Sequence, residues 1–213
     1  MASSSSTPSE GAATPARRGR VRWRRTAVMA VPAAAVGATL MVLTAQGVLG
    51  AQITISGMPF VVTADKLDGQ GFEQFGQLDH MPDGSPNAGN TGGTELVVVS
   101  AIRHATLTNL CQSVDLGGIN LHITAGTKAG HPVEANNLTT DSSDITGNAS
   151  FDNIEIGGDA STFTKAGVAG RSGVFGQQAD TVLINNLRQT NYATTAVKFT
   201  LPNLHLNFSD SAC

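Results

Sequence analysis

Serine residues are the most recognisable reactive groups in this sequence, and one of them stands close to a hydrolase signature. The string Gly170-Arg171-Ser172-Gly173-Val174 resembles the nucleophile elbow G-x-S-x-G. That elbow needs a glycine two positions before and two positions after the serine, because its strained turn leaves no room for side chains. The second glycine here comes one position early, so Ser172 is not predicted to be a nucleophile.

A base and a nucleophile could still come together from separate positions. The histidines are His80, His104, His122, His131 and His205. We take His104 and Ser113 as candidate catalytic residues, because a hairpin that folded back between them would bring an imidazole within reach of a hydroxyl. Such a pair also needs a third group to orient the imidazole. The alternative is that both are ordinary polar residues on strands.

The acidic residues do not form a metal-binding pattern. A calcium loop places oxygen ligands at alternate positions around a central glycine, and no acidic segment here does so. The sequence also lacks the His-Glu-x-x-His zinc motif. We therefore expect neither a metal nor a cofactor.

The N-terminal part of the chain has the composition of a targeting segment. Residues 1–25 begin with a Ser-, Thr-, Pro- and Ala-rich stretch that is predicted to be disordered, and six arginines lie between positions 17 and 25. Residues 26–51 are mostly apolar, and a helix of that length crosses a hydrocarbon core of ~30 Å. A basic flank before an apolar run predicts a cytoplasmic N-terminus and an exported C-terminal part. The apolar segment is either a cleaved signal peptide or a retained membrane anchor.

The predicted exported domain, residues 52–213, is acidic. Six of the 13 Lys and Arg residues and one of the 16 acidic residues precede it, which leaves 7 basic and 15 acidic residues and a formal charge of −8. A domain with that charge repels phosphate backbones, so no nucleic-acid partner is expected. Its length suits a single core.

Both cysteines, Cys111 and Cys213, fall in this domain. Two cysteines in an oxidising compartment most simply form one disulfide, and this one would tie the end of the chain to its middle. A metal site is the poorer interpretation, because no second cysteine or histidine stands near either one at ligand spacing.

Short alternating segments predict an all-β domain. Apolar residues occupy every second position in several stretches, such as 119–123, 197–201 and 204–208, and helix-forming residues are scarce. An Asn followed by Leu or Ile also recurs, with Asn at positions 109, 120, 137, 153, 186 and 203. Asn at a turn boundary can bond its own backbone, and the next residue can face the core. We expect antiparallel strand-turn-strand units in a sandwich or open groove, because the gaps between the repeats are not constant; a small β-solenoid is the alternative.

Five strings carry a resemblance to a known family. They are ADKLDGQGFEQFGQLD at 64–79, TNLCQSVDL at 108–116, IEIGGDASTFTK at 154–165, GQQADTV at 176–182 and ATTAVKFTLPNL at 193–204. Together they resemble a family of small exported actinobacterial proteins without an established function, many of which carry the product name cholesterol esterase. The resemblance implies an extracellular or cell-envelope setting and a link to steryl esters, and it assigns no catalytic residues.

Two functions are consistent with these observations. The first is an exported hydrolase of steryl or fatty-acyl esters, which the family name suggests. The second is a non-catalytic lipid-binding or structural protein of the cell envelope, whose alternating apolar residues would line a groove. Both involve an apolar lipid as the partner. The cytoplasmic membrane would be a further partner through residues 26–51 if that segment is retained.

Overall fold

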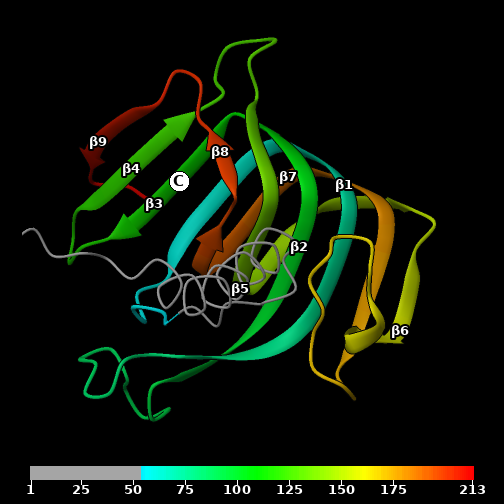
Figure 1. Cartoon of the computed structure of the whole chain (residues 1–213). Coiled ribbons are helices and arrows are strands. Elements are labelled where there is room, and N and C mark those ends of the chain that lie inside the picture. The colour runs from blue at the N-terminus through cyan, green and yellow to red at the C-terminus, as the bar shows by residue number, and fades with distance from the viewer. Residues whose placement is uncertain (1–53) are drawn as a thin grey trace, which may run out of the picture. The chain divides into compact units, whose positions relative to one another are not determined.

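A computed structural model describes residues 54–213 and shows an all-β domain, as the sequence predicts (Figure 1). The strands are β1 (Phe60–His80), β2 (Thr94–Thr108), β3 (Leu110–Asp115), β4 (Asn120–Ala125), β5 (Val133–Asp152), β6 (Glu155–Asp159), β7 (Phe175–Thr195), β8 (Lys198–Thr200) and β9 (His205–Ser209), with one 3-10 turn, η1 (Ala160–Thr162). The predicted disordered flank, 1–25, and the predicted signal or anchor helix, 26–51, lie outside the described residues. No helix of the described part is long and apolar enough to span a membrane.

Four long strands close into a ring. β1 pairs with β2, β2 with β5 and β5 with β7, and β7 pairs back with β1, all in antiparallel fashion. The closing pairing joins only residues 60–64 of β1 to residues 187–191 of β7, so the ring is a partial one. The predicted antiparallel architecture is therefore confirmed, and the alternative of a β-solenoid is wrong. The strands build one curled sheet rather than two stacked ones.

A smaller part of the same sheet, which we call the wing, consists of β3, β4 and β9. β3 continues β2 along the same edge of β1, since the register with β1 runs on unchanged from Thr108 to Cys111. β4 then pairs with β3, and β9 pairs with β4. Figure 1 shows the wing beside the ring, at the upper left. β2 and β3 thus form one kinked strand that belongs to both parts.

Small and medium-sized apolar side chains make up the main core of the ring. Among the residues that are essentially inaccessible are Ala105, Ala125, Val133, Ala179 and Val182. Small side chains allow the ring strands to approach each other closely at dense packing. Phe72 lies in the same core, with Phe60, Phe151 and Phe199 packed against it.

The Asn-Leu/Ile repeat has a structural cause, because five of its asparagines adopt a left-handed backbone conformation. Every non-glycine residue with positive φ in the described part is an asparagine of this repeat, with φ between 48° and 56°; these are Asn109, Asn137, Asn153, Asn186 and Asn203. Asparagine tolerates the left-handed region better than other residues that carry a Cβ. The following Leu110, Leu138 and Leu187 are buried as predicted, whereas Ile154 and Leu204 are exposed. The sixth member, Asn120, begins β4 in ordinary strand conformation.

Several of these left-handed residues lie in one row across the sheet. The Asn109 N–H donates to the Gly126 carbonyl at 3.1 Å, and the Gly126 N–H donates to the carbonyl of Pro202, the residue before Asn203, at 2.8 Å. The Asn109 side-chain amide also donates to the carboxylate of Asp65 on β1, and Asn186 of β7 directly precedes Leu187, which pairs with Ala64. Left-handed residues bend and twist a strand locally. Neighbouring strands therefore bend at the same level, where the wing departs from the ring.

The predicted disulfide between Cys111 and Cys213 is confirmed. The disulfide fixes the C-terminal tail to the polar face of the wing. Two hydrogen bonds hold the same tail in addition to the disulfide. The Cys213 N–H donates to the Ser113 hydroxyl at 3.0 Å, and the Arg188 guanidinium donates to the Cys213 carboxyl-terminal oxygen at 2.7 Å. The end of the chain is therefore anchored to β3 and to β7.

Candidate functional site

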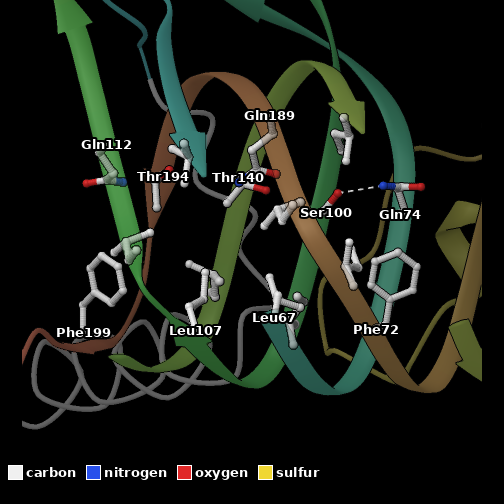
Figure 2. Close-up of a pocket in the computed structure, with 17 residues that line it drawn as sticks. Leu67, Phe72, Gln74, Ser100, Leu107, Gln112, Thr140, Gln189, Thr194 and Phe199 are labelled. Atoms are coloured by element: carbon white, nitrogen blue, oxygen red, sulfur yellow. Dashed lines mark hydrogen bonds between the residues drawn. The ribbon is translucent and has the colours of Figure 1, made fainter. Parts of the chain in front are cut away.

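An inner cavity of about 40 Å³ lies inside the ring (Figure 2). All four ring strands contribute to its wall, together with β3 and β8. One side of the wall is apolar and includes Leu67, Phe72 and Leu107, whereas the other carries the uncharged polar side chains of Gln74, Ser100, Gln112, Thr140, Gln189 and Thr194. Inward-facing polar residues are unusual in so small a ring, so this side of the cavity is a candidate binding site.

A larger cleft of about 650 Å³ adjoins the inner cavity. The wing and the segment before β1 form part of its wall, and the end of β7 and β8 form the rest. Gln112, Thr194 and Phe199 line both the cleft and the inner cavity, so these three side chains stand at the boundary between them. The volume of the cleft falls within the range that holds a small organic ligand.

The described residues of the two walls include no charged side chain and no histidine. Among the described residues, the lining of the cleft and of the inner cavity consists of apolar residues together with Ser, Thr, Gln and Tyr. An anion or a cation bound there would lose its hydration without gaining an opposite charge, which is strongly unfavourable. The site therefore suits an uncharged, largely apolar molecule.

Cross-strand rows on the wing extend the apolar surface of the cleft. Val114 of β3 lies opposite Leu121 of β4, and Leu121 lies opposite Phe208 of β9. Residues directly opposite each other in neighbouring strands share one face of the sheet. Phe208 is 62% exposed and Leu206 is 53% exposed. The apolar wall of the cleft thus continues onto an exposed face at the edge strand.

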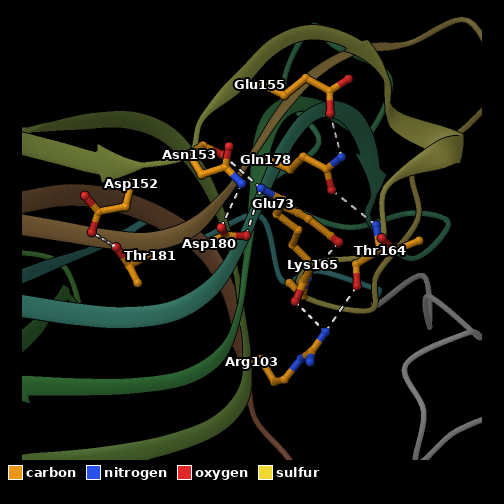
Figure 3. Close-up of polar contacts among 11 residues, drawn as sticks. Glu73, Arg103, Asp152, Asn153, Glu155, Thr164, Lys165, Gln178, Asp180 and Thr181 are labelled. Atoms are coloured by element: carbon orange, nitrogen blue, oxygen red, sulfur yellow. Dashed lines mark hydrogen bonds and ion pairs between the residues drawn. The ribbon is translucent and has the colours of Figure 1, made fainter.

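A polar network holds the segment between η1 and β7 against the ring (Figure 3). The fully buried Glu73 carboxylate accepts three backbone N–H groups, from Ala166 at 2.7 Å, from Gly167 at 3.3 Å and from Val168 at 3.0 Å. The exposed Arg103 guanidinium donates to the carbonyls of residues 164 and 165. These groups are fully engaged with backbone, so we assign them a structural role.

Two carboxyl groups lie buried against each other outside the cleft. Asp79 on β1 is 3% exposed and Asp141 on β5 is 5% exposed. Burial, followed by the neighbouring Asp79 carboxylate, raises the pKa of Asp141 to about 7. One oxygen of each group lacks a partner among the described residues, as expected where two carboxyl groups share one proton. Because neither group reaches solvent, the pair affects stability rather than chemistry on a substrate.

The structure does not bring the sequence-predicted catalytic residues together. β3 continues β2 instead of folding back, so His104 and Ser113 lie at different levels of one kinked strand. The His104 imidazole contacts the Asn136 amide oxygen at 2.8 Å, and the Ser113 hydroxyl accepts the Cys213 N–H. Ser172 is exposed in the segment before β7. None of the three forms a base–nucleophile pair with another.

The sequence did not identify several other residues of the site. Gln189 and Thr140 face the inner cavity, and nothing in their local sequence distinguishes them from surface residues of a strand. His122 lies directly opposite Ser113, and a nitrogen of its ring lies within 4.8 Å of both sulfur atoms of the disulfide. The strand register produces this proximity, which sequence spacing did not indicate. In the disulfide these sulfur atoms are not thiolate ligands.

The described part of this domain combines an antiparallel, partial ring with a disulfide-anchored wing and a cleft whose described lining is uncharged. Residues 56–213 match the family described as a family of unknown function (DUF6230), and the chain belongs to that family. No curated protein and no solved structure matches the chain. The family match agrees with the sequence-based resemblance in that the family has no established function.

Proposed function

We propose that this protein is an exported protein that binds a neutral, largely apolar lipid without chemically changing it. The observation that carries the proposal is the cleft of about 650 Å³ whose described lining has no charged side chain. Apolar walls favour hydrocarbon by roughly 25 cal/mol for each Å² removed from water. The absence of a positive charge in the lining disfavours fatty-acid anions and phospholipid headgroups.

Export is part of the same proposal. Its support is the basic and apolar N-terminal sequence together with the Cys111–Cys213 disulfide, since disulfides persist in oxidising compartments. The setting would be the cell envelope or the extracellular medium. An actinobacterial source and a link to steryl esters are implied by the resemblance alone.

Hydrolysis of steryl or fatty-acyl esters is the second candidate, because Ser113 lines the cleft. Two observations weigh against it. The Ser113 side chain is 3% exposed and its hydroxyl is engaged with the Cys213 N–H. No histidine lines the described wall of the cleft, so a general base is missing next to a bound ester.

Lipid recovered with the protein tests the proposal. The full-length chain and its Ala196→Asp variant are purified side by side and extracted with organic solvent, and the lipids are identified by mass spectrometry. Ala196 is a half-buried residue of the cleft wall between β7 and β8, so the new carboxylate places a charge in the cleft without removing a strand pairing. We expect neutral lipid with the wild type and much less with the variant. Equal amounts in both, or none in either, would count against lipid binding in the cleft.

Turnover of cholesteryl and p-nitrophenyl esters separates the two candidates. A binding protein gives no hydrolysis above buffer. Hydrolysis that disappears in Ser113→Ala but persists in Ser172→Ala would instead establish the serine hydrolase.

A further inference from the structure

Two buried polar side chains of the inner cavity have no hydrogen-bond partner in the described part of the chain. Gln189 on β7 is 6% exposed, and Thr140 on β5 is also 6% exposed. Figure 2 draws every residue of the cavity wall, and the single hydrogen bond among them joins Gln74 to Ser100, at 2.8 Å. The Gln189 amide and the Thr140 hydroxyl thus face the cavity with their hydrogen-bonding capacity unused.

Nearby buried polar groups behave differently. The Ser142 hydroxyl donates to the Asn191 amide oxygen at 2.7 Å, and the Asn191 amide donates to the Thr194 hydroxyl at 3.3 Å. Buried polar groups in proteins are nearly always partnered, and exceptions call for a specific cause. The enclosed side-chain atoms without a partner in the described part belong to Asp79 and Asp141, so the polar ends of Gln189 and Thr140 remain within reach of a water-sized molecule in the cavity.

Resting on the proposed function, we propose that Gln189 and Thr140 bind the single uncharged polar group of the lipid, a hydroxyl, while its hydrocarbon body occupies the cleft. A lipid alcohol both donates and accepts a hydrogen bond, as do an amide and a threonine hydroxyl. The ligand would pass between Gln112, Thr194 and Phe199, which line both spaces.

The size of the inner cavity restricts what can enter. Its volume of about 40 Å³ has room for a few water molecules, since one water needs roughly 10–15 Å³ on this measure, and therefore for a hydroxyl and the carbon that bears it. A carboxylate is disfavoured because no cationic side chain lines the described wall. In the free protein water is the natural occupant, and a hydroxyl reproduces its hydrogen bonds, whereas an alkane does not.

Matched ligands test the inference on the full-length chain. A long-chain saturated alcohol, the alkane and the carboxylate of equal carbon number are titrated by calorimetry into the wild type. We expect the alcohol to bind roughly tenfold more tightly than the alkane, which corresponds to about 1.4 kcal/mol, and the carboxylate to bind most weakly. Because the three titrations use the same chain, nonspecific uptake by the apolar N-terminal segment does not create the preference for the alcohol.

Two near-isosteric variants locate the preference. Gln189→Met and Thr140→Val remove the polar groups while keeping the side-chain size. Thr139→Val is the matched control, because Thr139 is the neighbouring strand residue and does not line the cavity. We expect the first two variants to bind the alcohol and the alkane with nearly equal affinity and to keep the affinity for the alkane. The control should retain the preference of the wild type.

The outcomes separate this inference from the proposed function. If no member of the series binds, the proposed function fails. If the lipids bind but the wild type shows no preference for the alcohol, the cavity only holds water and the inference fails while the proposed function stands. A preference that survives in both Gln189→Met and Thr140→Val also overturns the inference. Should the variants not fold, as checked by circular dichroism, the comparison of ligands on the wild type decides alone.

Discussion

Asp79 and Asp141 form a buried pair of carboxyl groups, each with an oxygen that lacks a partner among the described residues. Burial and the Asp79 carboxylate raise the pKa of Asp141 from 3.8 to about 7. In the unfolded chain this group loses its proton near pH 4, but in the folded protein it keeps the proton up to about pH 7. The contribution of Asp141 to the free energy of unfolding is therefore fully present below the pKa that this group has in the unfolded chain. It is lost as the pH rises through the pKa that the group has in the folded protein.

We predict that the free energy of unfolding falls by a few kcal/mol, on the order of the shift, between about pH 4 and pH 7. The introduced side chain in Asp141→Asn cannot ionise, and its amide can donate to Asp79. The free energy of unfolding of this variant should therefore depend little on pH and should exceed that of the wild type at pH 8. Urea unfolding at several pH values measures both. Asp144→Asn, on the exposed side of β5, is the control. An unchanged pH profile in Asp141→Asn would refute the shared proton.

The disulfide should make a large contribution to stability. It closes a loop with a sequence separation of 102 residues, and the chain-entropy model assigns about 4–5 kcal/mol to a loop of that size. We predict that Cys111→Ser and Cys213→Ser lower the free energy of unfolding by similar amounts in guanidinium chloride titrations. The contacts from Ser113 and Arg188 should keep the tail in place in the folded variants. A loss below about 1 kcal/mol would contradict the entropic account.

Glu73 should hold the segment between η1 and β7 in place. Its two carboxylate oxygens accept N–H groups from Ala166, Gly167 and Val168. In Glu73→Gln one of these oxygens becomes an NH₂ group that faces a donor, at a cost of about 1.5–3 kcal/mol. We predict faster trypsin cleavage after Lys165 and Arg171 in this variant.

The control for this experiment is Glu134→Gln, a change at an exposed position of β5. Cleavage after Lys165 at the same rate in Glu73→Gln, Glu134→Gln and the wild type would show that the carboxylate does not anchor the segment.

Asn186 isolates the energetic role of the asparagine repeat, because its φ is 54° and its side chain is exposed. Asn186→Ala should cost roughly 1 kcal/mol, since a Cβ without a polar side chain is strained in the left-handed region. Asn186→Gly should be neutral within a few tenths of a kcal/mol. Thermal unfolding compares the two variants with Asn185→Ala, whose backbone φ is not positive. Equal losses in the alanine and glycine variants would mean that conformation is not the cause.

Local patterns in the sequence were sufficient for the fold class. Alternating apolar residues indicate strands, and the asparagine repeat reflects a local backbone preference that any single Asn expresses. The Cys111–Cys213 pairing was predicted from the number of cysteines and the expected oxidising compartment, and the disulfide is present. None of these inferences depends on which strands become neighbours.

The site depends on long-range register, which local patterns do not encode. Closure of the ring requires β7 to pair with β1, far away in the sequence. In β5 the register with β7 shifts between Asp141 and Ser142, so simple alternation does not say that Thr140 faces the cavity. The hypothesis that His104 and Ser113 form a pair assumed a hairpin, whereas the chain continues along β1. Pairing of distant strands therefore decides which polar residues become part of the site.

We expect a neutral lipid to occupy the cleft, and the proposed function requires this occupancy. Calorimetric titration of a long-chain alcohol into the full-length wild type and Ala196→Asp tests this most directly, with Ala169→Asp as control, because Ala169 is exposed and far from the described wall of the cleft in sequence. We predict saturable binding by the wild type with a negative heat-capacity change, the same binding by Ala169→Asp, and at least roughly tenfold weaker binding by Ala196→Asp. Indistinguishable binding by all three proteins, or no saturable binding by the wild type, would contradict the account.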